Sequence, residues 1–264
     1  MKRLATPVLC AALAWIAGAC TSAAALPGGE VIDLTHAFDA DTIYWPTEEG
    51  FVLERGPAGY TEKGYYYAAN AFRSAEHGGT HIDAPRHFAE GRPTVDEIPL
   101  ERLIGPGVVV DVRAACAADR DYRVRVADLE AWEARNGRIP DGALVLLHTG
   151  FGRFWPDRER YLGTARRGPE AALELHFPGL HPDAARWLVT ERSIGAVGLD
   201  TPSIDHGPST HFESHVVLFE GQVPALENVA RLERLPAKGF DVVALPMKIR
   251  GGSGGPVRIV AIVR

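Results

Sequence analysis

The sequence predicts an α/β protein in which one domain contains a mixed β-sheet and few flanking helices. Runs of buried, β-branched residues that are typical of strands outnumber the segments with helical periodicity. The helical segments are scattered along the chain. No Pro/Ser-rich linker divides the chain beyond residue 25, and a composition of 46% hydrophobic and 23% charged residues over 264 positions suits one globular domain.

The first 25 residues predict an export signal. A basic Met-Lys-Arg start precedes a broken apolar stretch over residues 4–19, which is too short to span a bilayer stably. Cys20 follows Ala-Gly-Ala and resembles the lipid attachment site of a bacterial lipoprotein, whereas cleavage after Ala25 is the alternative. By either route we expect an exported protein, periplasmic or anchored in the bacterial envelope through Cys20, with its mature domain over residues 26–264.

Strand signals dominate the first half of the mature chain. The segments with strand character are residues 28–39, 42–56, 64–74 and 105–113. The second segment begins as an aromatic loop, and the third is rich in tyrosine and alanine. Three consecutive valines in the fourth segment predict a buried strand.

Helices enter in the second half. Residues 123–137 predict the end of a strand and then an amphipathic helix, with Asp128 near its start and Gly137 as its stop. Residues 181–193 predict another helix, because Pro182 suits the first turn and Asp183 lies near the positive end of the helix dipole.

The remaining segments complete the sheet and add one more helix. Residues 141–151 and 194–205 predict buried strands. Residues 225–236 predict a helix that ends at a proline. Residues 240–263 predict two strands joined by a glycine-rich turn, and we interpret Ser253 as part of that turn.

One segment, residues 75–91, concentrates side chains that bind metal ions. It places His77, His81, Asp83 and His87 within eleven residues, with two glycines and a proline among them. The glycines and the proline argue against a helix. In an extended segment, residues two apart share a face, so His81 and Asp83 point the same way, and the glycines let His77 return to the same point. Such a set of nitrogen and oxygen ligands suits Zn²⁺ or Mn²⁺.

His87 lies two residues beyond Pro85 and has two interpretations. It is either another metal ligand or a general acid or base beside the metal, a role that an unperturbed pKa near 6.5 suits. The alternative for the whole segment is a polar surface loop. Three histidines and an aspartate interleaved with glycine and proline favour the metal site.

The motif His-Gly-Gly-Thr-His-Ile-Asp-Ala-Pro-Arg-His resembles the signature of the metal-dependent cyclase family, which includes bacterial kynurenine formamidases and isatin hydrolase. The resemblance covers essentially the whole mature chain. Its other blocks are "VIDLTHAF", "YWP", "VLLHTGF", "VGLDTPSID" and "LPMKIRGGSGGPVRIVAI". The family implies a swivelling β/β/α fold with a barrel-like core, and a homodimer or larger assembly.

The resemblance also implies further ligands. The family pairs a histidine with a glutamate twelve residues later, and His215 and Glu227 have that spacing. Without the family, spacing alone could also nominate His211 as a ligand, because it lies four residues before His215. Glu227 is then interpreted as a carboxylate in the first turn of a helix. The family implies one or two ions per chain. One would be held by His77, His81 and Asp83, and a second by Asp83, His215 and Glu227.

The expected reaction is hydrolysis of a C–N amide bond by water that the metal activates, with His87 as the proton shuttle. No serine nucleophile elbow competes, because Ser253 lies in a turn between two predicted strands. Arylformamidase activity, which converts N-formylkynurenine to kynurenine and formate in tryptophan catabolism, is the first candidate. Opening of a cyclic amide or lactone of the isatin type is the second. An exported metal-binding lipoprotein without turnover is the alternative from another class.

The expected partner is a small-molecule amide. Trp45 and Phe72 are candidates for its pocket, although packing within the sheet is the alternative for such aromatic residues. A formal net charge of −6 without a basic run argues against nucleic acid as a partner. We expect membrane contact only through a lipid on Cys20.

Overall fold

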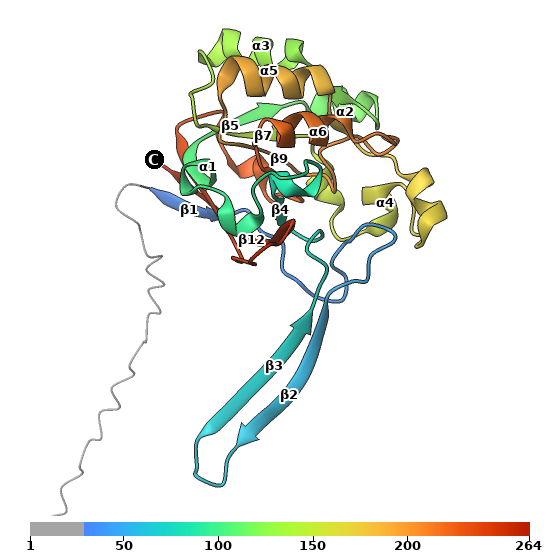
Figure 1. Ribbon diagram of the computed structural model, residues 1–264, viewed down its shortest axis with the longest axis vertical. Coiled ribbons are helices and arrows are strands. Elements are labelled where there is room, and N and C mark those ends of the chain that lie inside the picture. The colour runs from blue at the N-terminus through green and yellow to red at the C-terminus, as the bar shows by residue number, and fades with distance from the viewer. Residues whose placement is uncertain (1–28) are drawn as a thin grey trace, which may run out of the picture.

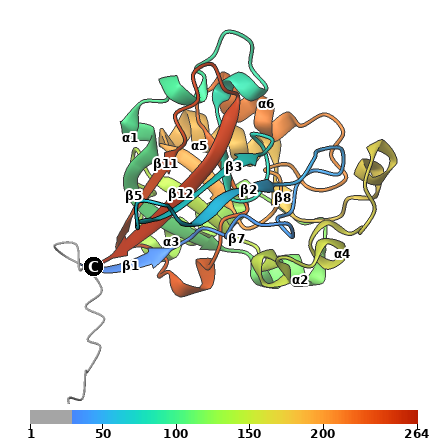
Figure 2. The same cartoon turned by 90° about the horizontal axis from the view of Figure 1, so that it is seen from below.

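The central element is a closed barrel of seven strands with one more strand at its edge (Figure 1 and Figure 2). The computed structural model describes residues 29–264, so the predicted leader and Cys20 lie outside the described residues. Neighbouring strands follow the order β1-β12-β11-β5-β7-β9-β10-β4, and β4 pairs back with β12. This confirms the predicted mixed, barrel-like core. The bounds are β1 (Glu30–Asp33), β4 (His81–Asp83), β5 (Ile104–Asp111), β7 (Leu144–His148), β9 (Ala196–Leu199), β10 (Ala225–Glu227), β11 (Phe240–Pro246) and β12 (Gly254–Val263).

The barrel is mixed because its strands run in both directions. β5, β7, β9 and β10 pair in parallel, whereas β12 is antiparallel to β1, β4 and β11. The parallel strands are the most deeply buried, as consecutive apolar residues predict. A Cβ atom on Gly198 of β9 would lie 2.9 Å from the Leu146 side chain and 3.1 Å from Leu226 Cβ, so glycine lets these strands pack closely.

Two hydrophobic layers flank the parallel strands. Alternate residues of a strand face opposite sides, so Leu144 and Leu146 join the cluster inside the barrel. Val145 and Leu147 join a second cluster beneath the helices that cover the outside (Figure 1). The helices are α1 (Leu100–Leu103), α2 (Arg113–Ala118), α3 (Val126–Asn136), α4 (Arg158–Leu162), α5 (Pro182–Arg192) and α6 (Glu213–Glu220).

The two helices predicted from capping signals are confirmed. α3 ends at Gly137, whose φ of 84° is easy for glycine, and Asp128 accepts the backbone N–H of Arg125 at the start of the helix. Pro182 occupies the first turn of α5. The sequence did not predict α6, which carries His215.

The predicted helix over residues 225–236 is wrong. Ala225–Glu227 form β10, which fits between β9 and β4, and only a short 3₁₀ turn follows at Leu232–Arg234. Leu226 is completely buried in the barrel, so pairing and burial outweigh the helical periodicity. The chain then turns through Asn228 and Arg231, whose φ angles of 54° and 55° are incompatible with a helix.

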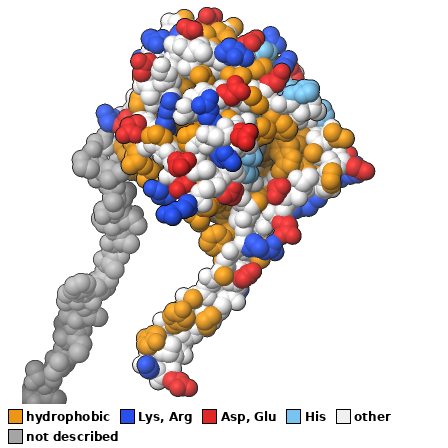
Figure 3. All heavy atoms as spheres, in the orientation of Figure 1, with side chains coloured by type: hydrophobic (Ala, Val, Ile, Leu, Met, Phe, Trp, Pro, Cys, Tyr) orange, Lys and Arg blue, Asp and Glu red, His pale blue; other side chains and the backbone are white. Residues whose placement is uncertain are grey.

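A two-stranded arm projects from the barrel (Figure 1 and Figure 3). It consists of β2 (Val52–Tyr60) and β3 (Tyr66–Arg73), which pair only with each other and expose nearly every residue. A smaller pair joins β6 (Arg123–Val124) to β8 (Gly179–Leu180). Over residues 29–264, no helix combines the length and the apolar character needed to cross a membrane.

Candidate metal centre

Two glycines shape the segment that carries the first histidines. Gly79 has a φ of 58°, and Gly78 passes so close to Tyr44 that a Cβ atom there would lie 2.1 Å from its ring. Only glycine fits both conditions. Directly afterwards the chain extends as β4, which pairs with β10 and β12. Pro85 then begins a 3₁₀ turn that ends at His87. The backbone is therefore irregular where the sequence predicts, and it is not helical.

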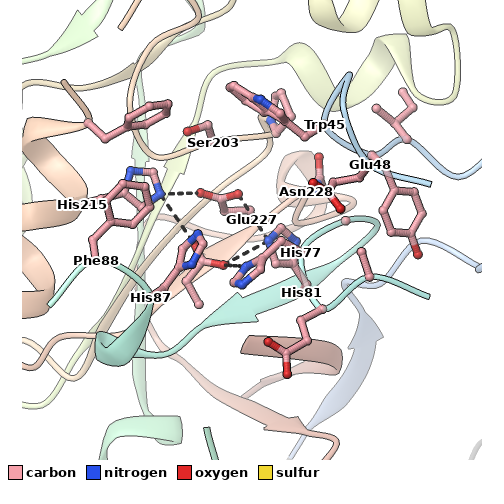
Figure 4. Close-up of a pocket in the computed structure, with 18 residues that line it drawn as sticks. Trp45, Glu48, His77, His81, His87, Phe88, Ser203, His215, Glu227 and Asn228 are labelled. Atoms are coloured by element: carbon pink, nitrogen blue, oxygen red, sulfur yellow. Dashed lines mark hydrogen bonds and ion pairs between the residues drawn. The ribbon is translucent and has the colours of Figure 1, made fainter. Parts of the chain in front are cut away.

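Four buried side chains from three distant parts of the chain converge (Figure 4). His81 Nε2 lies 3.1 Å from Asp83 Oδ1 and 3.4 Å from Glu227 Oε2. His215 Nε2 lies 3.4 Å from Asp83 Oδ2 and 3.2 Å from Glu227 Oε1. Barrel closure causes this meeting, because β4 and β10 are neighbours and His81 is the register partner of Glu227.

His77 and His87 lie at the more open side of this cluster. His77 Nδ1 is 2.7 Å from Asp83 Oδ1, and the His87 ring stacks on His77 with centroids 3.7 Å apart. Two overlapping donor groups result, and Asp83 belongs to both. They are His77–Asp83–His87 and His81–Asp83–Glu227. His211, the alternative by spacing, is exposed on the loop before α6.

The electrostatics of the cluster separate His87 from His81 and His215. Burial alone would lower the pKa of His81, but Asp83 and Glu227 raise it to about 9. His215 behaves alike, since Asp205, Asp83 and Glu227 hold its pKa well above the usual value despite burial. Burial lowers the pKa of His87 to about 4, so this imidazole is neutral at neutral pH.

The donor set fits a divalent cation. Among the described residues, no hydrogen-bond partner meets the buried Nε2 of His81, which is aimed at Asp83 and Glu227. Burial and the neighbouring Asp83 raise the pKa of Glu227, and a cation between the two carboxylates would offset their repulsion. Imidazole nitrogens with carboxylate oxygens suit Zn²⁺ or Mn²⁺.

Other side chains orient this set, and the sequence does not predict them. Asp205 Oδ2 lies 2.6 Å from His215 Nδ1 and also accepts the backbone N–H of His215 at 3.1 Å. The backbone N–H of Ile204 donates to Glu227 Oε1 at 2.8 Å. Such partners fix the rings and carboxylates of metal sites. The block "VGLDTPSID" contains Asp205, but its role depends on a contact across ten residues that no local pattern reveals.

A pocket of about 350 Å³ opens beside the cluster (Figure 4). Trp45 lines it together with Phe88 and Phe212, and these three rings form an aromatic wall. Among the described residues, the pocket lining includes neither lysine nor arginine. Phe72 lies elsewhere: it is on β3 of the arm, half exposed, stacked on Phe51 and outside the pocket lining.

Comparison with known proteins identifies the family. A family model described as "Putative cyclase" matches residues 32–206. Isatin hydrolase from Roseibium aggregatum is 33% identical over 212 residues, which cover 77% of this chain and 78% of that protein. The chain therefore belongs to the cyclase family.

Other relatives and solved structures agree. Kynurenine formamidase from Salinibacter ruber is 28% identical over 230 residues, which cover 87% of this chain and 96% of that protein. The structure of isatin hydrolase A from Labrenzia aggregata bound to benzyl benzoate superposes with a TM-score of 0.78 and 34% identity, and covers 89% of this chain and 93% of that one. An isatin hydrolase bound to the product analogue thioisatinate gives the same TM-score at 30% identity, with coverage of 89% and 92%.

Proposed function

We propose that this protein is a metal-dependent hydrolase that cleaves a C–N amide bond next to an aromatic ring. One observation carries the proposal. Two histidines and two carboxylates from β4, α6 and β10 converge beside an aromatic pocket, and His81 Nε2 has no hydrogen-bond partner among the described residues. Relatives of the chain are named as isatin hydrolase and kynurenine formamidase, which supports hydrolysis.

The residues divide into three tasks. The ion or ions would be held by His77, His81, Asp83, His215 and Glu227. When bound, such an ion polarises a carbonyl group and lowers the pKa of a neighbouring water molecule. His87 is neutral at pH 7, so it takes the proton from the attacking water and returns it to the leaving nitrogen. Trp45 and Phe88 pack against the ring of the substrate.

The pocket favours an uncharged substrate. A carboxylate on the substrate would find no lysine or arginine in the described pocket lining to pair with. Opening of a cyclic amide of the isatin type requires no such pairing. The isatin hydrolases are also more similar to this chain, at 30–34% identity, than the kynurenine formamidases, at 26–29%.

Arylformamidase activity is the second candidate. A kynurenine formamidase aligns over 96% of its length, so the whole fold is shared with such enzymes. The bond broken is again an amide next to an aromatic ring, and the same side chains serve. The relatives are named as enzymes, which does not favour a metal-binding protein without turnover.

Turnover of isatin and N-formylkynurenine tests the proposal. We expect the Zn²⁺- or Mn²⁺-loaded protein to hydrolyse at least one of them, with isatin preferred. His87→Ala should lower kcat about 10²–10⁴-fold and leave metal affinity intact. His211→Ala is the matched control, because it removes an exposed histidine near the site, and its kcat should match the parent. Equal turnover by the His87 variant, or no turnover of any amide by the metal-loaded parent, would contradict the proposal.

A further inference from the structure

We propose that Ser253 and Glu76 are positioning residues that fix the ring of His77 so that its Nδ1 faces the metal. The inference rests on the proposed role of His77 as a ligand. His77 needs such support more than its neighbours, since 24% of its side chain is exposed against 3% for His81 and 4% for His215. A ring at the solvent edge can rotate and exchange tautomers unless hydrogen bonds hold it.

The three side chains form a chain of hydrogen bonds. His77 Nε2 lies 2.8 Å from Ser253 Oγ, and Ser253 Oγ donates to Glu76 Oε2 at 2.6 Å. The backbone N–H of Ser253 donates to the same Glu76 oxygen at 3.0 Å. On the other side of the ring, His77 Nδ1 is 2.7 Å from Asp83 Oδ1.

The positions of the Ser253 hydroxyl proton and the His77 ring proton follow from counting the hydrogen-bond donors in this chain of contacts. A serine hydroxyl has one proton, and here it goes to the carboxylate of Glu76. Ser253 Oγ can therefore only accept from His77, so Nε2 carries the ring proton. In the neutral ring, Nδ1 then has a free lone pair, and it is the atom that points to Asp83. The tautomer that binds a metal through Nδ1 is thus selected in advance.

The glycines around Ser253 make room for this arrangement. A Cβ atom on Gly254 would lie 2.6 Å from His77 Cε1, and one on Gly252 would lie 2.7 Å from Glu76 Oε1. Pairing between β12 and β4 brings the segment to the site, because Gly254 is the register partner of Asp83. The run Gly-Gly-Ser-Gly-Gly therefore places the Ser253 hydroxyl between His77 and Glu76, so it has a role beyond forming a turn.

A rival interpretation uses the same atoms. Ser253, His77 and Asp83 have the connectivity of a Ser-His-Asp catalytic triad. Three observations argue against it. The hydroxyl proton goes to Glu76 and is not available to His77, and Asp83 also contacts His81 and His215. The segment also leads into strand β12 and not into a helix, unlike a nucleophile elbow.

Nitrogen NMR of the Zn²⁺-loaded parent protein, with ¹⁵N-labelled histidine, tests the tautomer directly. The His77 signals are assigned by their loss in His77→Gln. We expect a protonated Nε2 and a metal-bound Nδ1. A metal-bound Nε2 with a proton on Nδ1 would overturn the inference, and so would covalent labelling of Ser253 by a fluorophosphonate.

Zn²⁺ affinity, measured by competition with a chromophoric chelator, tests the contribution of the two residues. Ser253→Ala should weaken binding about 10–100-fold, as loss of an outer-shell partner does, and Glu76→Gln should weaken it less, because the amide oxygen still accepts a hydrogen bond. Glu48→Gln is the matched control: it removes the same charge from the same pocket, Glu48 makes no hydrogen bond to His77 among the described residues, and the affinity of the variant should equal that of the parent.

The outcomes separate this inference from the proposed function. Parent-like affinity of Ser253→Ala, or equal losses in Glu76→Gln and Glu48→Gln, would overturn the positioning role while the metal site stands. Failure of the parent to bind Zn²⁺ would defeat the proposed function, and the positioning role with it.

Discussion

Asp83 is the residue that connects the two donor groups of the site. It contacts His77, His81 and His215, and it belongs to both donor groups. Burial alone would raise its pKa, but the neighbouring histidines hold that pKa well below the usual value. A buried carboxylate that stays charged among imidazoles is the local anion that a divalent ion requires.

The sequence predicts one part of the site more directly than the other. His77, His81, Asp83 and His87 lie within eleven residues, so backbone geometry alone brings them together. His215 and Glu227 were reached only through the resemblance to a family, because they meet the others through barrel closure. The roles of Ser253, Glu76 and Asp205 also depend on contacts outside a local stretch of sequence, so the sequence predicts Ser253 only as a turn residue.

His36 allows a prediction about stability and pH. Burial and the nearby Arg231 lower its pKa to about 4, while Asp33 opposes the shift, and its ring stacks on Trp155 at 4.2 Å. The folded state thus binds this proton less well than the unfolded state. Stability is fully present above pH 6.5 and is lost as the pH falls toward 4, by about 1–2 kcal/mol at pH 5.

His36→Phe isolates this contribution, because it keeps the aromatic stack and removes the titration. Urea unfolding at pH 7.5 and pH 5 should show a smaller loss of free energy of unfolding in the variant than in the parent. The same loss in both proteins would mean that His36 does not titrate as described.

At the scale of elements, helical periodicity in the sequence predicted a helix correctly where capping signals and one buried face supported it. α3 and α5 have capping signals and one buried face, and both form. Residues 225–236 have helical spacing, yet their first three residues complete the barrel as β10. Sheet closure is a long-range property, and a window of local sequence does not contain it.

Gly78→Ala should disturb the loop that leads into β4. The new Cβ atom would lie 2.1 Å from the Tyr44 ring at a φ of 153°, so both a clash and backbone strain arise. We expect a loss of about 2–4 kcal/mol in the free energy of unfolding, together with weaker Zn²⁺ binding.

Gly64→Ala is the control, because Gly64 also has a positive φ, of 84°, but no atom lies within 4 Å of the added Cβ. Its cost should be about 1 kcal/mol, the conformational part alone. Equal destabilisation of the two variants would show that the contact with Tyr44 is unimportant.

At the scale of the whole molecule, the arm formed by β2 and β3 pairs with no strand of the barrel, so the barrel does not account for its stability. An isolated two-stranded hairpin is only marginally stable in water. The arm nevertheless exposes large apolar side chains on both strands (Figure 3). They are Val52, Leu53, Tyr60, Tyr66, Tyr67 and Phe72. Such a surface suits the homodimer or larger assembly that the resemblance predicts, and the assembly stays a prediction, as does export through the leader.

Sedimentation velocity of a protein that spans residues 26–264 checks this prediction. We expect a dimer or larger species at micromolar concentration, because two arms together offer on the order of 1,000 Å² of aromatic and aliphatic surface, the size of a stable interface. Replacing residues 53–72 by a short Gly-Ser turn should yield a monomer. A monomeric parent, or an arm-deleted protein that stays dimeric, would contradict it.

The central claim is that the five proposed ligands hold a divalent cation. Anomalous diffraction at the zinc or manganese edge, on crystals of metal-loaded protein, tests it most directly. We expect a peak about 2.0–2.3 Å from His77 Nδ1, His81 Nε2 and a carboxylate oxygen of Asp83, with a second peak at Asp83, His215 and Glu227 if two ions bind. Saturating metal without a peak at this cluster, or with its peak elsewhere on the molecule, would contradict the account.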